Sequence, residues 1–170
     1  MYQQQHYPNQ PQRSAIPKVI GILMIIFASL GLLGSLIGLA GGGGNQELFR
    51  GIPEYKTWRT IELLLNVIGL AYGALHLYAG VRCVGYKANA PALAKTYAIV
   101  AMGVVLVNAI LVFAWIKPLM DKALGEFGSG AGTMFGGIMI FATLLGLAWP
   151  TIVLILMTRP AAKAACTAEL

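Results

Sequence analysis

The sequence has 170 residues, of which 58% are apolar and only 11% are charged, whereas a soluble domain carries roughly 25% charged residues. This composition excludes an ordinary water-soluble fold, a coiled coil, a collagen-like chain and a disulfide-rich secreted module. In a soluble protein the formal net charge of +6 would suggest nucleic-acid binding. In so apolar a chain the charges instead indicate orientation in a membrane, and we expect no nucleic-acid partner.

Four runs without any charged residue are longer than the ~18 apolar residues that mark a membrane-spanning helix. They are Val19–Gln46, Leu63–Val81, Thr96–Ile116 and Phe127–Thr158. They predict spans at 19–40, 61–81, 96–116 and 136–158 within a transmembrane domain of residues 18–159, between a disordered tail (1–17) and a short tail (160–170). Because short loops make successive helices antiparallel, we expect an all-α integral membrane protein with four helices in an up-down bundle.

The first span has small residues on one side and ends at four consecutive glycines, Gly41–Gly44, which readily end a helix. Gly31, Gly34 and Gly38 lie on that side and include a Gly-x-x-x-Gly motif. Small-residue faces let helices approach closely in lipid. We expect this face to pack inside the bundle, with contact to a second copy of the chain as the alternative.

The second span has the most regular pattern in the chain. Small and polar residues recur every three or four positions, within a stripe about 80° wide: Glu62, Asn66, Gly69, Gly73, His76 and Gly80. The stripe predicts packing against the glycine face of the first span. Trp58 precedes the span at the expected headgroup level, and Glu62, at its outer end, is within reach of Arg59 for an ion pair.

His76 is the one ionisable residue predicted to lie well inside a span. Such a group is by default a candidate for function, and the alternative is a hydrogen-bonded packing residue. The other histidine, His6, lies in the predicted tail, so the sequence offers no pair of axial ligands for a haem. We expect no cofactor and no metal.

Asn108 lies near the middle of the third span, on the same face as Tyr97 and Trp115. An unpaired amide is unfavourable in hydrocarbon, so we expect Asn108 to be satisfied inside the bundle, with Asn66 as its partner. A polar pathway through the bundle is the alternative. The span is expected to close with the interfacial Trp115, just before Pro118.

The fourth span contains Pro150, which has no backbone N–H to donate to the carbonyl of Gly146. We therefore expect a helix kink at Pro150, with the hydroxyls of Thr143 and Thr151 helping to satisfy the freed groups. The glycine-rich stretch 125–137 lacks the sequence context of a phosphate-binding loop, and we expect a flexible outer linker there.

One internal correspondence suggests a repeat. A shift of 77 residues places Lys18 on Lys95, Tyr72 on Trp149 and Arg82 on Arg159. If it is real, the chain consists of two tandem parallel helical hairpins; coincidence within the small alphabet of membrane segments is the alternative.

The distribution of cations indicates the topology. Seven Lys and Arg lie in the two tails and the middle loop, and five lie in the other two loops. Because several of the seven lie directly beside a span, the positive-inside rule places both termini in the cytoplasm. Cys83 and Cys166 would then face the reducing side, where a disulfide is not expected. The absence of an Asn-x-Ser/Thr sequon fits a bacterial cytoplasmic (inner) membrane.

The sequence contains no recognisable catalytic constellation: we find no paired acids, nucleophile triad, Walker loop or histidine-rich metal motif. We therefore expect no enzyme and no catalytic residues. The leading expectation is an interaction, scaffold or accessory subunit of a membrane assembly, whose partners are the lipid bilayer and other membrane proteins or copies of itself. The alternative is a small transporter or channel-forming oligomer, with Asn66, His76 and Asn108 lining a polar route.

Overall fold

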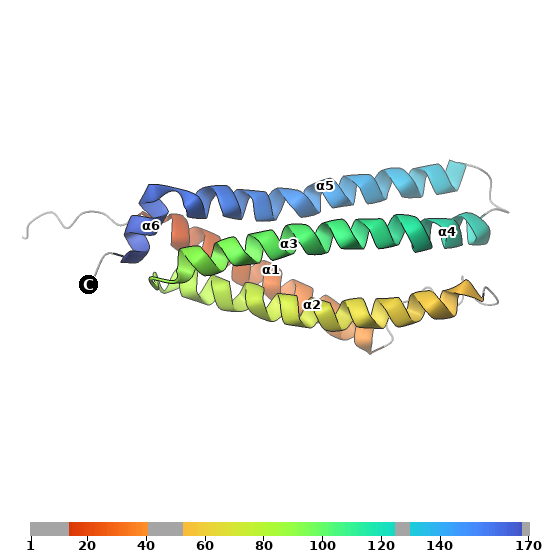
Figure 1. The fold of residues 1–170 in the computed structure, drawn as a ribbon, viewed down its shortest axis with the longest axis horizontal. Helices are drawn as coiled ribbons and strands as arrows, with labels where there is room; N and C mark the ends of the chain where they lie inside the picture. Colours follow the sequence, from red (N-terminus) through yellow and green to blue (C-terminus); the bar gives the residue numbers. More distant parts are fainter. Residues whose placement is uncertain (1–13, 41–52, 125–129, 168–170) are drawn as a thin grey trace, which may run out of the picture.

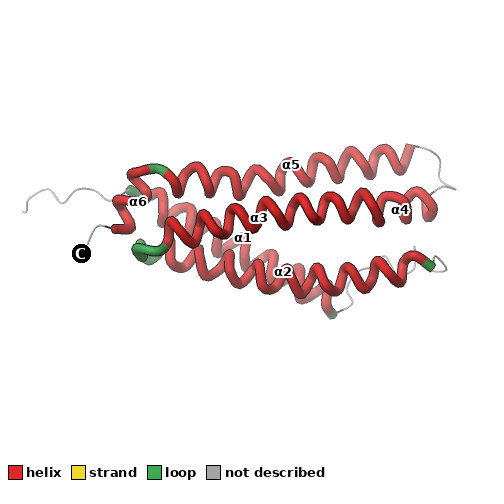
Figure 2. The backbone as a smooth tube through the Cα atoms, viewed as in Figure 1, coloured by secondary structure: helices red, strands yellow, loops and turns green. Residues whose placement is uncertain are grey.

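The computed structural model describes residues 14–40, 53–124 and 130–167, and the regular structure in these ranges is entirely helical (Figure 2). The elements are α1 (Ile16–Leu39), α2 (Glu54–Val84), α3 (Ala90–Leu111), the π-helical turn η1 (Val112–Ile116), α4 (Lys117–Leu124), α5 (Gly130–Thr158) and α6 (Pro160–Thr167). Four stretches are long and apolar enough to cross a membrane: Ile16–Leu39, Tyr55–Val84, Ala90–Leu119 and Gly136–Thr158. The predicted all-α bundle of four membrane-spanning helices is confirmed.

The four long helices pack as two hairpins. The first consists of α1 against α2, the second of α3 against α5, and α2 packs on α3 to join them (Figure 1). This pairing agrees with two tandem hairpins. The 77-residue correspondence in sequence stays a prediction, to be tested by superposing the two hairpins.

Burial is concentrated at one end of the bundle, which carries the α2–α3 turn (residues 85–89) and α6. We call it the basic end. The buried residues of α1 all lie in its first half, between Pro17 and Ala28, and those of α3 lie between Ala90 and Ala101. Toward the opposite end, α2 diverges from α3 and α4 (Figure 1). The hairpins are therefore held together mainly at the basic end.

The turn between α2 and α3 is closed by two backbone hydrogen bonds. The N–H of Lys87 donates to the carbonyl of Arg82, and the N–H of Tyr86 donates to that of Cys83, both at 3.1 Å. This is the Schellman pattern at a helix C-terminus, in which the residue in left-handed conformation is usually glycine. Here that residue is Tyr86, with φ of 50°. Its ring packs against the core at the basic end, which offsets the backbone strain.

The sequence predicted that the third membrane helix ends near Pro118, but the helix does not end there. It continues through η1 into α4, as far as Leu124. In an unbroken α-helix the ring of Pro118 would press on the carbonyl of Ala114. The wide turn η1 lies directly before Pro118, and there the N–H of Lys117 donates to the carbonyl of Val112, five residues earlier. This turn accommodates the proline without ending the helix.

Helical structure extends into three segments that the sequence did not predict to be part of a span. Helix α1 begins at Ile16, inside the predicted tail, and α5 begins at Gly130, inside the predicted glycine-rich linker. The predicted tail after residue 159 forms α6, because proline is well suited to the first helical position and alanine favours helix. The buried side chains of α6 are Ala162, Ala165 and Cys166. Residues 1–13, 41–52, 125–129 and 168–170 lie outside the described part of the chain, including the glycine run at 41–44.

Candidate functional site

The imidazole of His76 is the only polar or charged side chain that is buried among the described residues, with 4% of its surface exposed. It lies on α2 and stacks on the ring of Tyr97 from α3. The two centroids are 3.9 Å apart and the planes 16° apart. Tyr97 is itself 1% exposed. The contact places a histidine and a tyrosine face to face between the two hairpins.

Further aromatic side chains extend this stack. Tyr72, one turn before His76 on α2, donates a 3.0 Å hydrogen bond from its hydroxyl to that of Tyr97, and the two rings stack at 5.5 Å. On the other hairpin, Trp149 of α5 meets Phe27 of α1 edge-on, with centroids 4.8 Å apart. We call these five residues the aromatic cluster. All four membrane-spanning helices contribute to it.

Two nitrogen atoms of the aromatic cluster are buried without a hydrogen-bond partner within the described residues: Nε2 of His76 and Nε1 of Trp149. The indole of Trp149 lies near the Tyr97 hydroxyl but does not reach hydrogen-bond geometry with it. Buried polar atoms are normally paired. These two nitrogens are therefore exceptions, and each could accept a hydrogen-bond partner that the described residues do not provide.

The aromatic cluster lies within the apolar part of the helices. His76 is eight residues before the end of α2, Tyr97 seven after the start of α3, and Trp149 nine before the end of α5. At about 1.5 Å of rise per residue, these positions are roughly 10–14 Å from the basic end. The cluster therefore lies within the apolar stretches of the helices, where the two hairpins meet.

The other two predicted polar residues, Asn66 and Asn108, are not part of this cluster. Asn66 is half-buried and faces α1, because a Cβ atom added to Gly38 would lie 2.6 Å from its amide. Asn108 is exposed on α3. The predicted Asn66–Asn108 pair is therefore wrong, because the hairpins diverge at this height and Asn66 points into its own hairpin. Asn66 therefore faces α1, whereas His76 faces α3.

The small stripe of α2 packs on α1. A Cβ atom at Gly69 would lie 2.6 Å from the Ser35 hydroxyl, and one at Gly73 would lie 2.7 Å from Cδ2 of Leu32. A Cβ atom at Gly80 would lie 3.0 Å from the carbonyl oxygen of Gly21. The helices of this hairpin therefore approach most closely through the glycines of α2.

The matching face of α1 agrees with the predicted one at Gly38, which packs against Asn66, but not at Gly31 and Gly34. Apart from the backbone of α1 itself and the adjacent residues, no atom of the described chain lies within 4 Å of a Cβ built on Gly31 or Gly34, and both residues are exposed. The packing face instead includes Gly21, where a Cβ atom would lie only 2.7 Å from the carbonyl oxygen of Gly80 and from the amide nitrogen of Val84. The sequence signal for Gly21 was its seven-residue spacing from Ala28, a buried small residue on the same helix face.

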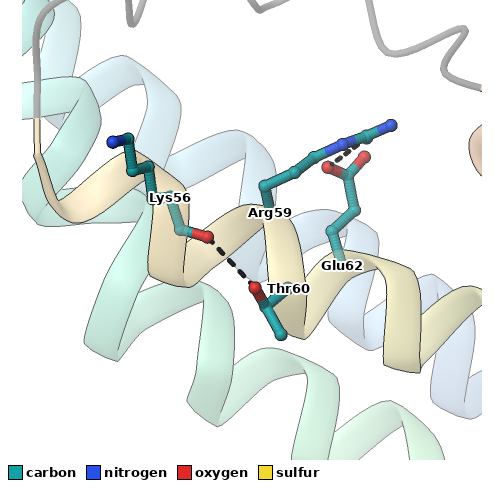
Figure 3. Close-up of polar contacts among 4 residues, drawn as sticks. All are labelled: Lys56, Arg59, Thr60 and Glu62. Atoms are coloured by element: carbon teal, nitrogen blue, oxygen red, sulfur yellow. Dashed lines mark hydrogen bonds and ion pairs between the residues drawn. The ribbon is translucent and has the colours of Figure 1, made fainter.

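The outer end of α2 carries an ion pair that lies apart from the aromatic cluster. Nη1 of Arg59 is 2.8 Å from Oε2 of Glu62, and the Thr60 hydroxyl donates to the carbonyl of Lys56 at 3.3 Å (Figure 3). Glu62 is 14 residues before His76, which is about 21 Å along the helix. Trp58, which precedes Arg59 in the chain, is half-buried.

Near the same end, Trp115 belongs to η1 and is 40% exposed. It does not mark the end of its helix, which runs on to Leu124. One turn of helix beyond η1 is stabilised by an exposed ion pair between Lys117 and Asp121, at 2.7 Å. Trp115 therefore lies inside a continuous helix rather than at its terminus.

Helix α5 is one element through Pro150, which is buried. Contrary to the prediction, the two nearby threonines do not donate a hydrogen bond to the carbonyl of Gly146. Thr143 donates to the carbonyl of Met139 and Thr151 to that of Leu147, both at 2.8 Å. A hydroxyl four residues after a carbonyl is within easy reach of it, so each threonine bonds within its own turn. The kink at Pro150 stays a prediction.

Sequence reasoning found His76 but missed the four aromatic residues around it. Two signals were present. Tyr72 precedes His76 by one helical turn and so shares its face, and the 77-residue shift aligns Tyr72 with Trp149. Both of these residues lie beside Tyr97 in the structure.

The aromatic cluster offers stacking surfaces, one hydrogen-bonded phenol pair and two unsatisfied nitrogens. Within residues 14–40, 53–124 and 130–167, no three His, Cys, Asp or Glu side chains gather where they could hold a metal ion. Comparisons with protein-family models, with curated proteins and with solved structures find no match for this chain. The function must therefore be argued from the geometry.

Proposed function

We propose that this protein is a non-enzymatic interaction or accessory subunit of a membrane assembly. It would cross a bacterial cytoplasmic membrane four times with both termini in the cytoplasm. The basic end would then face the cytoplasm, as the positive-inside rule expects for Lys87, Lys95 and Lys163. In this proposal the aromatic cluster holds the two hairpins together, and the diverging outer halves receive the partner.

The observation that carries the proposal is the exposed amide of Asn108. It is 18 residues after the start of α3, or about 27 Å along a span some 45 Å long. An amide facing hydrocarbon is unfavourable unless it is hydrogen-bonded. Polar residues at such positions commonly bond across to another helix. A partner helix would satisfy Asn108, and no partner within the described part of this chain does so.

The position of Asn108 on its helix indicates where that partner would lie. Asn108 is 11 residues after Tyr97, so it lies about 20° from the direction in which Tyr97 faces α2. On the opposing helix, Ile68 is one turn before Tyr72 and is 51% exposed. The sides of α2 and α3 that touch each other near the basic end therefore carry exposed residues farther along, where the helices diverge. A transmembrane helix between the diverging halves would cover them.

The alternative of a small transporter or channel-forming oligomer requires Asn66, His76 and Asn108 to share a path. Asn66 faces α1 while His76 faces α3, so the three residues do not line one path within a single chain, and this alternative has less support. An oligomer could still assemble such a path across several copies, so the experiment below also measures whether copies associate.

The proposal is tested by native mass spectrometry of the tagged full chain, extracted into lipid nanodiscs or a gentle detergent. We expect a complex heavier than the 18.1 kDa of a single chain. The Asn108→Leu variant should shift most of it to the single-chain mass. The matched control is Ser29→Ala, because Ser29 is exposed on α1 but already donates to the carbonyl of Ile25 at 2.9 Å.

Two differently tagged copies expressed together distinguish the kinds of partner. Copurification of both tags would identify a second copy of the chain, and copurification of another polypeptide would identify an accessory role. A wild-type protein that is purely monomeric under all of these conditions would contradict the proposal.

A further inference from the structure

A cavity of about 330 Å³ opens at the basic end, between the start of α3, the end of α5 and α6. Lys95 of α3 and Lys163 of α6 both line it, together with Pro91, Met157, Thr158 and Thr167. The three elements meet at the end of the bundle (Figure 1). Two ammonium groups from different helices therefore share one concave, partly apolar surface.

No carboxylate balances these cations within the described part of the chain. The described acidic residues, Glu54, Glu62 and Asp121, lie at the opposite end, in α2 and α4. Both ion pairs of the described residues are also at that end. Two like charges around one cavity, with no carboxylate among the described residues at this end, create a potential that favours an anion.

A nearby cation, Arg82, differs from the two lysines because its side chain already has a partner. Arg82 also lies at the basic end, but its Nε donates to the Tyr78 hydroxyl at 3.1 Å and its guanidinium lies 5.3 Å from the centre of the Tyr78 ring. The side chain of Arg82 is therefore engaged within α2. Lys95 and Lys163 are exposed at the cavity and have the flexible stems with which ammonium groups follow a ligand.

The hydroxyl groups in the cavity are already committed as donors. Thr158 donates to the carbonyl of Ile155 at 2.9 Å, and Thr167 donates to that of Lys163 at 3.1 Å. The side-chain donors that the described lining leaves for an anion are therefore the two ammonium groups. The remaining lining, including Pro91 and Met157, is apolar.

We propose that this cavity binds the phosphate headgroup of an anionic phospholipid, with Lys95 and Lys163 as its two charged contacts. The cavity lies where two membrane-spanning helices reach their ends, at the level of the headgroups. Basic pockets between transmembrane helices at this level bind anionic lipid headgroups. The apolar lining can accept the glycerol and the first methylenes of the chains, which a free phosphate ion does not have.

The full chain, purified in detergent, is tested for lipid retention by native mass spectrometry after addition of equal amounts of phosphatidylglycerol and phosphatidylcholine. We expect phosphatidylglycerol to be retained in preference by about 25-fold, because each lysine near an anionic headgroup contributes roughly a fivefold factor. The Lys95→Gln/Lys163→Gln variant should retain both lipids alike. High salt should reduce the preference, because it screens exposed charges.

The matched control is Lys18→Gln/Lys87→Gln. It removes the same two charges from the same end of the bundle, and neither residue lines the cavity. We expect this control to keep the preference of the wild type. All four lysines are exposed, so both variants should keep the wild-type helical circular-dichroism signal and thermal midpoint in lipid-free detergent.

Three results would overturn the proposal. The first is equal retention of the two lipids by the wild type. The second is an equal loss of preference in the control variant, since the attraction would then be a diffuse effect of net charge. The third is complete displacement of the lipid by inorganic phosphate in molar excess, which would identify the ligand as free phosphate. None of these results depends on whether the protein has a partner at Asn108.

Discussion

His76 and Tyr97 join the two hairpins through a face-to-face ring contact, with their centroids 3.9 Å apart. The residues come from α2 and α3, which are consecutive in sequence but belong to different hairpins. The contact lies in the half of the bundle where burial is concentrated. It is therefore the natural point at which to perturb the association of the hairpins.

Replacing His76 by alanine removes one ring of this stack and leaves a cavity. We expect the free energy of unfolding to fall by about 2 kcal/mol or more, measured by denaturant unfolding in detergent. His76→Phe keeps a ring and removes the unsatisfied nitrogen, so its stability should equal or exceed that of the wild type.

Proton flux in proteoliposomes distinguishes this packing role from transport. Neither His76 variant should alter flux if the side chain only packs. A variant of normal stability with changed flux, or changed pH dependence of flux, would instead favour the transporter alternative. Equal destabilisation by alanine and phenylalanine would mean that a nitrogen of His76 makes an essential contact.

The hydrogen bond between the hydroxyls of Tyr72 and Tyr97 should give a measurable coupling free energy for unfolding. Each single change to phenylalanine removes the 3.0 Å hydrogen bond between them and should lower stability by about 0.5–1.5 kcal/mol. The double variant should lose little more than either single variant. A double-mutant cycle should give a coupling near 0.6 kcal/mol, typical of hydrogen bonds between membrane helices. Strictly additive losses would contradict the bond.

Gly21 and Gly34 provide a matched pair on one helix. A Cβ atom at Gly21 would lie 2.7 Å from backbone atoms of α2, whereas nothing lies within 4 Å of one at Gly34. Gly21→Ala should therefore force the helices apart and lower the thermal midpoint, because backbone cannot move aside as a flexible side chain can. Gly34→Ala should leave it unchanged or raise it slightly.

The same pair tests whether the exposed glycines of α1 contact another chain. If Gly34→Ala lowers the midpoint as well, and does so only at protein concentrations where copies associate, the Gly31–Gly34 surface packs against a second copy. This was the alternative that the sequence left open for the glycine face.

The two cysteines should react slowly with a thiol reagent. Cys83 is fully buried and Cys166 is 4% exposed. Accessible thiolate is the reactive form, so we expect maleimide labelling of the folded protein to be slow and labelling in denaturant to be complete. Ala161→Cys, at an exposed position of α6, is the positive control. Fast labelling of the wild type would mean that α6 does not cover the end of the bundle.

Much of the fold could be predicted from sequence because membrane spans require only length and hydropathy. All four were found from charge-free runs: the fourth span, 136–158, agrees at both ends, and the ends of the other three differ by one to six residues. The helix ends were harder to predict, because local caps and turns determine where a helix stops. Pro118 looked like the end of a helix, but the π-helical turn before it allows the helix to continue to Leu124.

The candidate site was predictable only in part. Scarcity of polar residues within the spans was enough to single out His76. Its partners could not be identified from one helix, since Tyr97 comes from another helix and Trp149 from a third. For the same reason, Asn66 and Asn108 looked like partners, although Asn66 faces Gly38 within its own hairpin.

The sequence by itself determined that the chain forms four helices long and apolar enough to cross a membrane, because unpaired backbone is too unfavourable in hydrocarbon for an irregular apolar segment. It also determined which helix faces are small, since that depends only on spacing. Only the tertiary structure decided which of those faces meet: Gly21 packs on Gly80, while Gly31 and Gly34 stay open. Helix pairing in lipid depends on how well two surfaces fit each other, and that fit is a property of both helices together.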